Sequence, residues 1–323
     1  MNTSALKKLL ILFLALFSSL LFGQSYPMKP VTIVVTYAPG GLGDMLARQL
    51  ADQLTQRTKQ SFIVENKPGA TGALGSRYVA KSKSDGYTLL LGQTGEMVIN
   101  TLVSKDLGYD PYLDFKPVAL IGEVPLTLVA PLSAPYNTLP ELIQFSKAQP
   151  NKLTYASSGT ATPGHLAAAS LCQLIGINMT HAPYKGAGQA MTDILGAHVD
   201  MFFASTPSVV QFIEGKKVKA LAISSTKRIN IFPQLHTVAE DIGKDFSFTL
   251  WGGIFAPSET PEPILQSLNI LINSILADPV FKKQLENEGI NVRQNSREEF
   301  TQFHRSELSN YKKSTQSINL KSE

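Results

Sequence analysis

The chain has 323 residues, of which 43% are hydrophobic and 17% charged, and its formal net charge is +4. This charge is small and no basic cluster with interleaved aromatic residues occurs, so we expect no nucleic-acid partner. Cys172 is the only cysteine, which excludes an internal disulfide, and its apolar helical surroundings predict a buried, inert thiol.

The first 25 residues have the features of a secretory signal peptide. Lys7 and Lys8 precede an apolar run over 9–22, and small residues follow at Gly23 and Ser25. A run of about 14 residues is shorter than the roughly 20 that a membrane-spanning helix needs. No later segment is long and apolar enough to span a bilayer. We therefore expect cleavage near residues 23–25 and export of the remaining chain to the periplasm.

Strand-like and helical patterns alternate along the rest of the chain. This alternation predicts an α/β fold with mostly parallel sheets flanked by helices. Strands are expected at 31–36, 62–65, 88–91, 117–121, 126–130, 153–156, 178–181, 199–203, 218–224 and 248–255, and the last three helices at 262–276, 279–288 and 297–313.

The order of these elements predicts two lobes. Residues 26–125 and 250–323 are expected to form lobe 1, and residues 126–249 lobe 2, because the last helices have no further strands of their own to cover. Crossover segments near 124–126 and 250–253 would then join the lobes on either side of a cleft.

The most informative motif is the turn YAPGGLGD at 37–44, which follows an apolar, β-branched strand and precedes an amphipathic helix. Asp44 is expected to cap that helix. The glycines of the turn carry no Cβ that would block a ligand, and the free N–H groups at the start of a helix attract negative charge. The turn therefore predicts an anion site for a phosphate or a carboxylate.

Four further bends, rich in glycine or hydroxyl residues, also follow strands. In α/β sheets ligands lie outside the carboxyl ends of the strands, so five such bends on two lobes predict a shared ligand cleft. The bends are NKPGATGALG at 66–75, GQTGE at 92–96, SSGTATPGH at 157–165 and YKGAGQ at 184–189.

Enzymatic motifs are incomplete or missing. A dinucleotide fingerprint fails because Met45 and Leu46 stand where a third glycine belongs, and neither a phosphate loop nor a G-x-S-x-G serine motif occurs. The histidines are scattered without metal-ligand spacing. We therefore expect no cofactor, no metal and no catalytic residues, and binding without turnover is favoured.

These motifs, in this order, resemble the extracytoplasmic solute-binding receptors of tripartite tricarboxylate transporters, the Bug (Bordetella uptake gene) or TctC-like family. The resemblance covers essentially the whole mature chain. It rests on YPMKP at 26–30, Pro39-Gly40-Gly41 with Asp44 and Ala47-Arg48, VENKPGA at 64–70, DGYTLL at 85–90, YASSG at 155–159, PYKG at 183–186, TVAE at 237–240 and Trp251-Gly252.

The resemblance implies a two-lobed periplasmic-binding-protein fold (type II) that closes on a small carboxylated ligand, held mainly by backbone N–H groups and hydroxyls. It also implies delivery to a small and a large membrane subunit, or to a signalling partner, by a protein that we expect to be a monomer. The candidate ligand-binding residues are Tyr37, Pro39, Gly40, Gly41, Leu42, Gly43, Asp44, Gly69, Ala70, Thr71, Gly72, Gln93, Thr94, Gly95, Ser157, Ser158, Gly159, Thr162, His165, Tyr184, Lys185, Gly186, Ala204 and Ser205.

Two departures from the family bear on the ligand. Gly43 stands where relatives usually carry Thr or Ser, which removes a hydroxyl donor. Glu96 stands where they carry small polar residues, and it either faces the cleft, where it would pair with an amino or hydroxyl group of the ligand, or points to solvent. Two other classes stay open: a secreted α/β enzyme acting on a small carboxylate, and a protein-interaction module.

Overall fold

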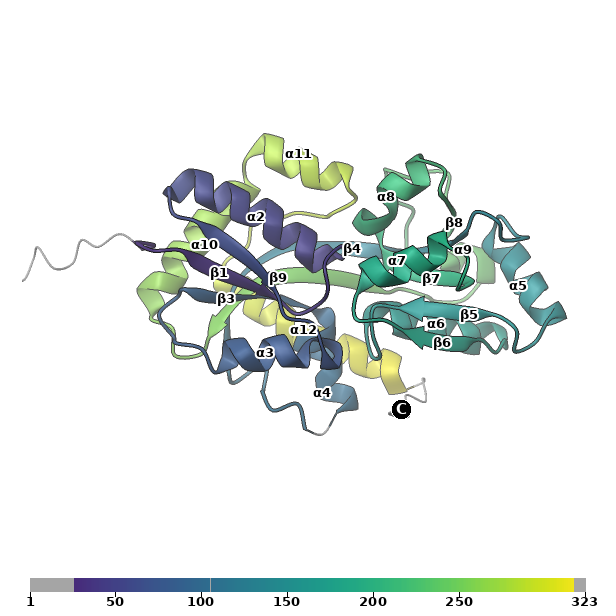
Figure 1. Ribbon diagram of the computed structural model, residues 1–323, viewed down its shortest axis with the longest axis horizontal. Coiled ribbons are helices and arrows are strands. Elements are labelled where there is room, and N and C mark those ends of the chain that lie inside the picture. The colour runs from purple at the N-terminus through teal and green to yellow at the C-terminus, as the bar shows by residue number, and fades with distance from the viewer. Residues whose placement is uncertain (1–25, 105, 317–323) are drawn as a thin grey trace, which may run out of the picture.

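The computed structural model describes residues 26–104 and 106–316, so the expected signal peptide lies outside the described residues (Figure 1). The strands are β1 (Val31–Val35), β2 (Phe62–Asn66), β3 (Thr88–Gln93), β4 (Phe115–Pro131), β5 (Thr154–Ser157), β6 (Thr180–Pro183), β7 (Met201–Ser205), β8 (Val218–Ile223) and β9 (Thr249–Pro257). The helices are α2 (Leu42–Thr58), α3 (Ala73–Ala80), α4 (Asn100–Val103), α5 (Leu139–Ala148), α6 (Pro163–Ile175), α7 (Ala187–Leu195), α8 (Thr206–Glu214), α9 (Val238–Ile242), α10 (Glu262–Leu276), α11 (Pro279–Asn287) and α12 (Arg297–Gln316), with the short turns η1 (Ala70–Gly72) and η2 (Gly95–Ile99).

The strands form a mixed sheet in the order β2-β1-β3-β9-β4-β7-β5-β6, and β8 also pairs with β4. Strand β1 runs parallel to β2 and β3, and β5 runs parallel to β6 and β7. Strands β4 and β9 run antiparallel to every strand with which they pair. The expected α/β fold is confirmed, but the sheet is mixed and not mostly parallel, because every pairing made by β4 and β9 is antiparallel.

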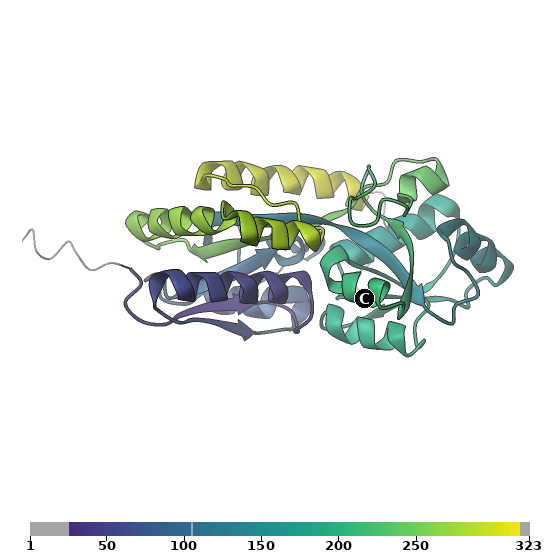
Figure 2. The same cartoon turned by 90° about the horizontal axis from the view of Figure 1, so that it is seen from above.

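Strand β4 carries the chain from one half of the molecule to the other. Its residues from Phe115 to Pro125 pair with β9, and those from Leu126 to Pro131 pair with β7 and β8. The two strands expected at 117–121 and 126–130 are thus one strand of 17 residues. Figure 2 shows the two halves side by side along the long axis of the molecule.

Helices cover both faces of the first half of the sheet. Figure 1 shows α2, α10 and α11 on one face and α3, α4 and α12 on the other. Accordingly Val31, Ile33 and Val35 of β1 pack in one apolar core, and Val34 packs in the other. Because both faces of β1 are covered, the strand cannot alternate between apolar and polar residues, and four of its five residues are valine or isoleucine.

The C-terminal helices return to this half. Helices α10 and α12 both pack on β4, and α10 also lies against α2. Trp251 of β9 is completely buried, packs edge-on against Phe300 of α12, and donates its indole N–H to Glu307 Oε2 at 3.1 Å. The long helix α12 thereby fixes the strand that leads back from the second half.

Among the described residues, no single helix has the length and apolar character needed to cross a membrane. Helices α10 and α11 meet that test only when taken together, and they are bent by 72° at their junction.

Candidate ligand-binding site

The turn after β1 differs in one detail from its expected structure. Helix α2 begins at Leu42, with Gly41 in the N-cap position, so it starts two residues before Asp44. Asp44 therefore lies in the first turn of the helix and is not its N-cap residue. The N-cap residue carries no side chain, so the first N–H groups of α2 are left open toward the cleft.

The carboxylate of Asp44 holds this turn together. It accepts hydrogen bonds from the N–H of Gly40 at 3.2 Å, from Arg48 Nε at 3.0 Å and from Asn66 Nδ2 at 3.0 Å. Burial by itself would raise the pKa of Asp44, but the hydrogen bonds from Arg48, Asn66 and Gly40 outweigh it and lower the pKa. The negative charge of Asp44 is thus already paired before any ligand arrives.

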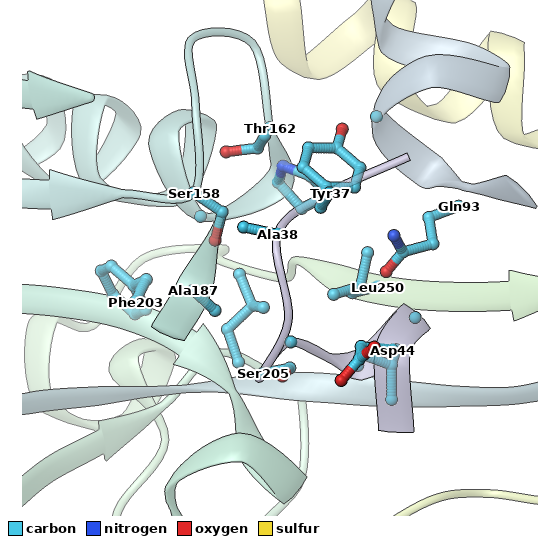
Figure 3. A pocket seen from close by; sticks show the side chains of 17 residues that line it. Tyr37, Ala38, Asp44, Gln93, Ser158, Thr162, Ala187, Phe203, Ser205 and Leu250 are labelled. Carbon is cyan, nitrogen blue, oxygen red and sulfur yellow. The ribbon is translucent and has the colours of Figure 1, made fainter. Parts of the chain in front are cut away.

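The N-terminal ends of α2, α6 and α7 and of the π-helical turn η2 meet at one cavity between the two halves (Figure 3). Its empty space measures about 530 Å³, part of it open to solvent. It is lined by Tyr37, Ala38, Gly41, Leu42, Gly43, Asp44, Gln93, Gly95, Leu126, Ser158, Thr162, Pro163, Gly164, Ala187, Phe203, Ser205 and Leu250.

No lysine or arginine is among the described residues that line this cavity. Positive potential comes instead from the main chain, because the first N–H groups of each helix have no partner inside the helix and the helix dipole places partial positive charge there. Several such ends aimed at one space make a site that favours an anion without a basic side chain.

The two halves touch beside this cavity through main-chain atoms. The N–H of Ala38 donates to the carbonyl of Lys185 at 3.2 Å. A Cβ atom added to Gly188 would lie 2.5 Å from the carbonyl oxygen of Pro39, and one added to Gly186 would lie 3.0 Å from Ala38 N. Glycine is needed at these positions because any side chain would separate the two loops.

A second cavity, with about 540 Å³ of empty space, is also lined by Tyr37. It shares Tyr37 and Ser158 with the first cavity, and it includes the exposed residue Lys185. It is lined by Tyr37, Gly69, Ala70, Thr71, Gly72, Ser158, Gly159, Thr160, Pro183, Tyr184 and Lys185.

The structure brings most of the predicted site residues to these two cavities. The first is lined by Tyr37, Gly41, Leu42, Gly43, Asp44, Gln93, Gly95, Ser158, Thr162 and Ser205. The second is lined by Tyr37, Gly69, Ala70, Thr71, Gly72, Ser158, Gly159, Tyr184 and Lys185. Seven predicted residues line neither: Pro39, Gly40, Thr94, Ser157, His165, Gly186 and Ala204.

These seven residues lie in the structure around the cavities. Pro39, Gly40 and Gly186 lie where the main chains of the two halves come into contact. The hydroxyl of Thr94 accepts a hydrogen bond from the N–H of Trp251 at 3.0 Å, which ties the third bend to β9. Ala204 is buried within β7.

Ser157 and His165 belong to a buried polar cluster in the second half. Ser157 Oγ lies 2.7 Å from His181 Nε2 and donates to the carbonyl of Gly159 at 2.9 Å. The rings of His165 and His181 stack at 4.0 Å, and the N–H of Ala161 donates to His165 Nδ1. Burial, followed by the neighbouring His181, lowers the pKa of His165 to about 3. The cluster shapes the bend after β5, and its serine is fully buried.

Sequence reasoning missed the apolar wall of the first cavity. Leu126 and Leu250 lie on β4 and β9, the strands that join the halves, and Phe203 lies on β7 of the second half. The sequence signal for Leu126 and Leu250 was their position in the expected crossover segments, and that for Phe203 was its place at the end of the strand expected at 199–203. Ala187 and Gly164, in the first turns of α7 and α6, lay inside or beside expected bends and were also missed.

Glu96 neither faces the cleft nor points to solvent, so both expectations for it are wrong. It is fully buried, and its Oε1 accepts hydrogen bonds from Thr36 Oγ1 at 2.9 Å and from the N–H of Gln93 at 2.8 Å. Its Oε2 has no hydrogen-bond partner among the described residues. Desolvation raises the pKa of Glu96 to about 7, although these hydrogen bonds act in the opposite direction. Glu96 therefore ties the first bend to the third from behind the cavity.

Two α/β halves joined by shared strands, with an anion-favouring cavity between them, define the protein as a two-lobed binding protein. Comparison with known proteins then identifies the family. The sequence model of the family described as the tripartite tricarboxylate transporter family receptor matches residues 46–320 of this chain. The chain therefore belongs to this receptor family.

Individual relatives agree. BugT of Bordetella pertussis is 34% identical over 254 residues, which cover 78% of each chain. Among solved structures, the periplasmic binding protein BugD has a TM-score of 0.88 and 33% identity, covering 92% of this chain and all of its own. A Rhodopseudomonas palustris protein with adipate has a TM-score of 0.88 and 30% identity, covering 91% of this chain and 98% of its own. MatC from the same organism, with bound malate, has a TM-score of 0.84 and 29% identity, with coverages of 90% and 99%.

Proposed function

We propose that this protein captures a small carboxylated metabolite between its lobes in the periplasm and delivers it to the membrane subunits of a tripartite tricarboxylate transporter. The observation that carries the proposal is the first cavity, where helix N-termini from both halves meet without a basic side chain. Two solved relatives carry adipate and malate, both small dicarboxylates. A signalling partner in place of the transporter is the second candidate for delivery.

The lobes in this proposal have the bounds expected from the sequence, with lobe 1 formed by 26–125 and 250–323 and lobe 2 by 126–249. The change of β4 from pairing with β9 to pairing with β7 and β8 falls between Pro125 and Leu126, which supports this division. The ligand would bind through the N–H groups at the starts of α2, η2, α6 and α7, with the hydroxyl of Ser158 beside them, whereas the hydroxyl of Thr162 already donates to the carbonyl of Gly159 at 2.8 Å. Closure of the lobes would remove it from water.

Three measurements on the purified mature chain distinguish binding from catalysis. Native mass spectrometry detects any acid that co-purifies, and a thermal-shift screen of mono-, di- and tricarboxylates finds those that stabilise the protein by RT ln(1 + [L]/Kd). We expect one equivalent of the acid to bind each monomer with a micromolar Kd, which corresponds to a binding free energy of about −8 kcal/mol. NMR of the acid after long incubation should show it unchanged.

Two outcomes would contradict the proposal. Conversion of the acid would favour a secreted enzyme, and the absence of stabilisation by any small acid would favour a protein-interaction module. Delivery needs its own test, in which the mature protein with its bound acid is added to proteoliposomes that hold the small and large subunits. Uptake of the acid should require all three components.

A further inference from the structure

Among the described residues that line the first cavity, Gln93 is the only one with an amide side chain. It is the last residue of β3, and only 5% of its surface is exposed. Its backbone N–H is held by Glu96, which fixes the position of the residue. Its side-chain amide, in contrast, makes no hydrogen bond with any described residue. Figure 3 shows this amide directed toward the interior of the cavity, near Leu250.

Gly43 leaves the space that the amide occupies. A Cβ atom on Gly43 would lie 2.6 Å from Gln93 Nε2 and 2.8 Å from its Cδ. Gly43 lies in the first turn of α2 and does not have a positive φ, so its backbone conformation does not demand glycine. Room is therefore the reason for glycine here, and the end of Gln93 stands where a side chain at position 43 would project.

An amide from Gln93, in the space that Gly43 leaves, changes which ligands the cavity can recognise. Helix N-termini offer only donors, whereas an amide offers two N–H donors and one carbonyl acceptor, whichever way it is turned. A carboxylate satisfies the donors but not the acceptor. A buried acceptor left without a donor costs free energy, so a ligand that supplies a donor is favoured over one that does not. Asp44 is the one carboxylate among the described residues that line the cavity, and it accepts hydrogen bonds and cannot supply one.

We propose that Gln93 is a specificity-determining residue that selects acids bearing a hydrogen-bond donor, a hydroxyl or an amino group, next to a carboxylate. This inference rests on the proposed function, because it takes the first cavity to be the carboxylate site. It assigns to Gln93 the part that a hydroxyl at position 43 would otherwise play.

Isothermal titration calorimetry with succinate, malate and aspartate tests the proposal, since these acids differ only at one carbon. We expect the wild-type chain to bind malate or aspartate at least tenfold more tightly than succinate. Gln93→Met keeps the length of the side chain beside Gly43 but removes donor and acceptor, so this ratio should fall to about one. Gln56→Met, on the exposed side of α2, should leave the ratio unchanged.

A second set of variants tests the exchange between positions 43 and 93. Gly43→Ser alone should displace the amide and abolish the preference. Combined with Gln93→Ala, the same serine gains room, and its hydroxyl offers both a donor and an acceptor to the cavity. The preference for malate or aspartate over succinate should then return in part, so the two effects should not add. Circular dichroism and melting curves check that each variant folds.

The outcomes are distinct. A wild-type chain that binds all three acids equally, or Gln93→Met that keeps the preference, overturns the inference while the proposed function stands. A chain that binds none of them, nor any other acid of the screen, overturns both.

Discussion

The carboxyl of Glu96 offers the sharpest test of the electrostatics behind the site. Glu96→Gln keeps an oxygen that can accept from Thr36 Oγ1 and the N–H of Gln93, and it removes the negative charge. The pKa of Glu96 rises from 4.5 to about 7 because burial disfavours the charged form. One pKa unit corresponds to about 1.4 kcal/mol, so the ionised group costs the folded state about 3 kcal/mol.

The sign follows from proton binding. The folded chain holds the proton of Glu96 more tightly than the unfolded chain does, so the free energy of unfolding falls as pH rises from 4.5 through 7. Below 4.5 both states are protonated and the penalty vanishes. Most of it, about 2.5 kcal/mol, develops between pH 5 and pH 8. Gln at this position has no such dependence.

Denaturant unfolding of wild type and Glu96→Gln at several pH values measures this difference. We expect the variant to gain about 2.5 kcal/mol relative to wild type between pH 5 and pH 8, or roughly 5 °C in Tm. Comparison across pH cancels the constant effect of burying an amide. Glu259→Gln, at an exposed carboxylate, serves as the control and should follow wild type. Parallel curves for wild type and Glu96→Gln would refute the reasoning.

Two further predictions concern the closed cleft and the core. In Gly188→Ala the new Cβ lies 2.5 Å from the Pro39 carbonyl, so the lobes cannot approach fully, and ligand affinity should fall more than tenfold by calorimetry with no loss of Tm. In the control Gly196→Ala, at the other end of α7, the three atoms nearest to the new Cβ all belong to the exposed ring of His198, so this variant should bind as wild type; equal affinities in both variants would disprove the steric argument. Burial raises the pKa of Cys172 to about 12, so an aromatic disulfide reagent at pH 8 should label it only after unfolding, and rapid labelling of the native chain would contradict the buried position.

Much of the site was accessible from the sequence because its parts are local. The turn at 37–44 follows from one apolar strand, three glycines and one amphipathic helix, and all of these lie within about thirty residues. The same logic found the bends after β2, β3, β5 and β6. Where it failed in detail, as with the start of α2, the cause was an N-cap glycine that offers no side-chain signal.

Contacts between distant residues could not be read in this way. The sequence places Glu96 in a bend beside the cleft, but the parallel pairing of β1 with β3 brings Thr36 against it, and the residue is fully buried. From the sequence, Gly43 is only the loss of a hydroxyl donor, whereas the packing of α2 against β3 places the end of Gln93 where a side chain at position 43 would project. The apolar wall of Leu126, Phe203 and Leu250 likewise depends on which strands cross between the lobes.

The sequence by itself therefore determined the α/β class, the order of the elements and the five bends that carry backbone donors, because each follows from periodicity and turn chemistry over a short span. Tertiary structure alone decided which bends share a cavity, which polar groups are buried behind it, and how closely the two lobes approach. Those properties depend on strand register and on side-chain volume at contacts between residues far apart in the chain, and a single sequence does not encode either in any local pattern.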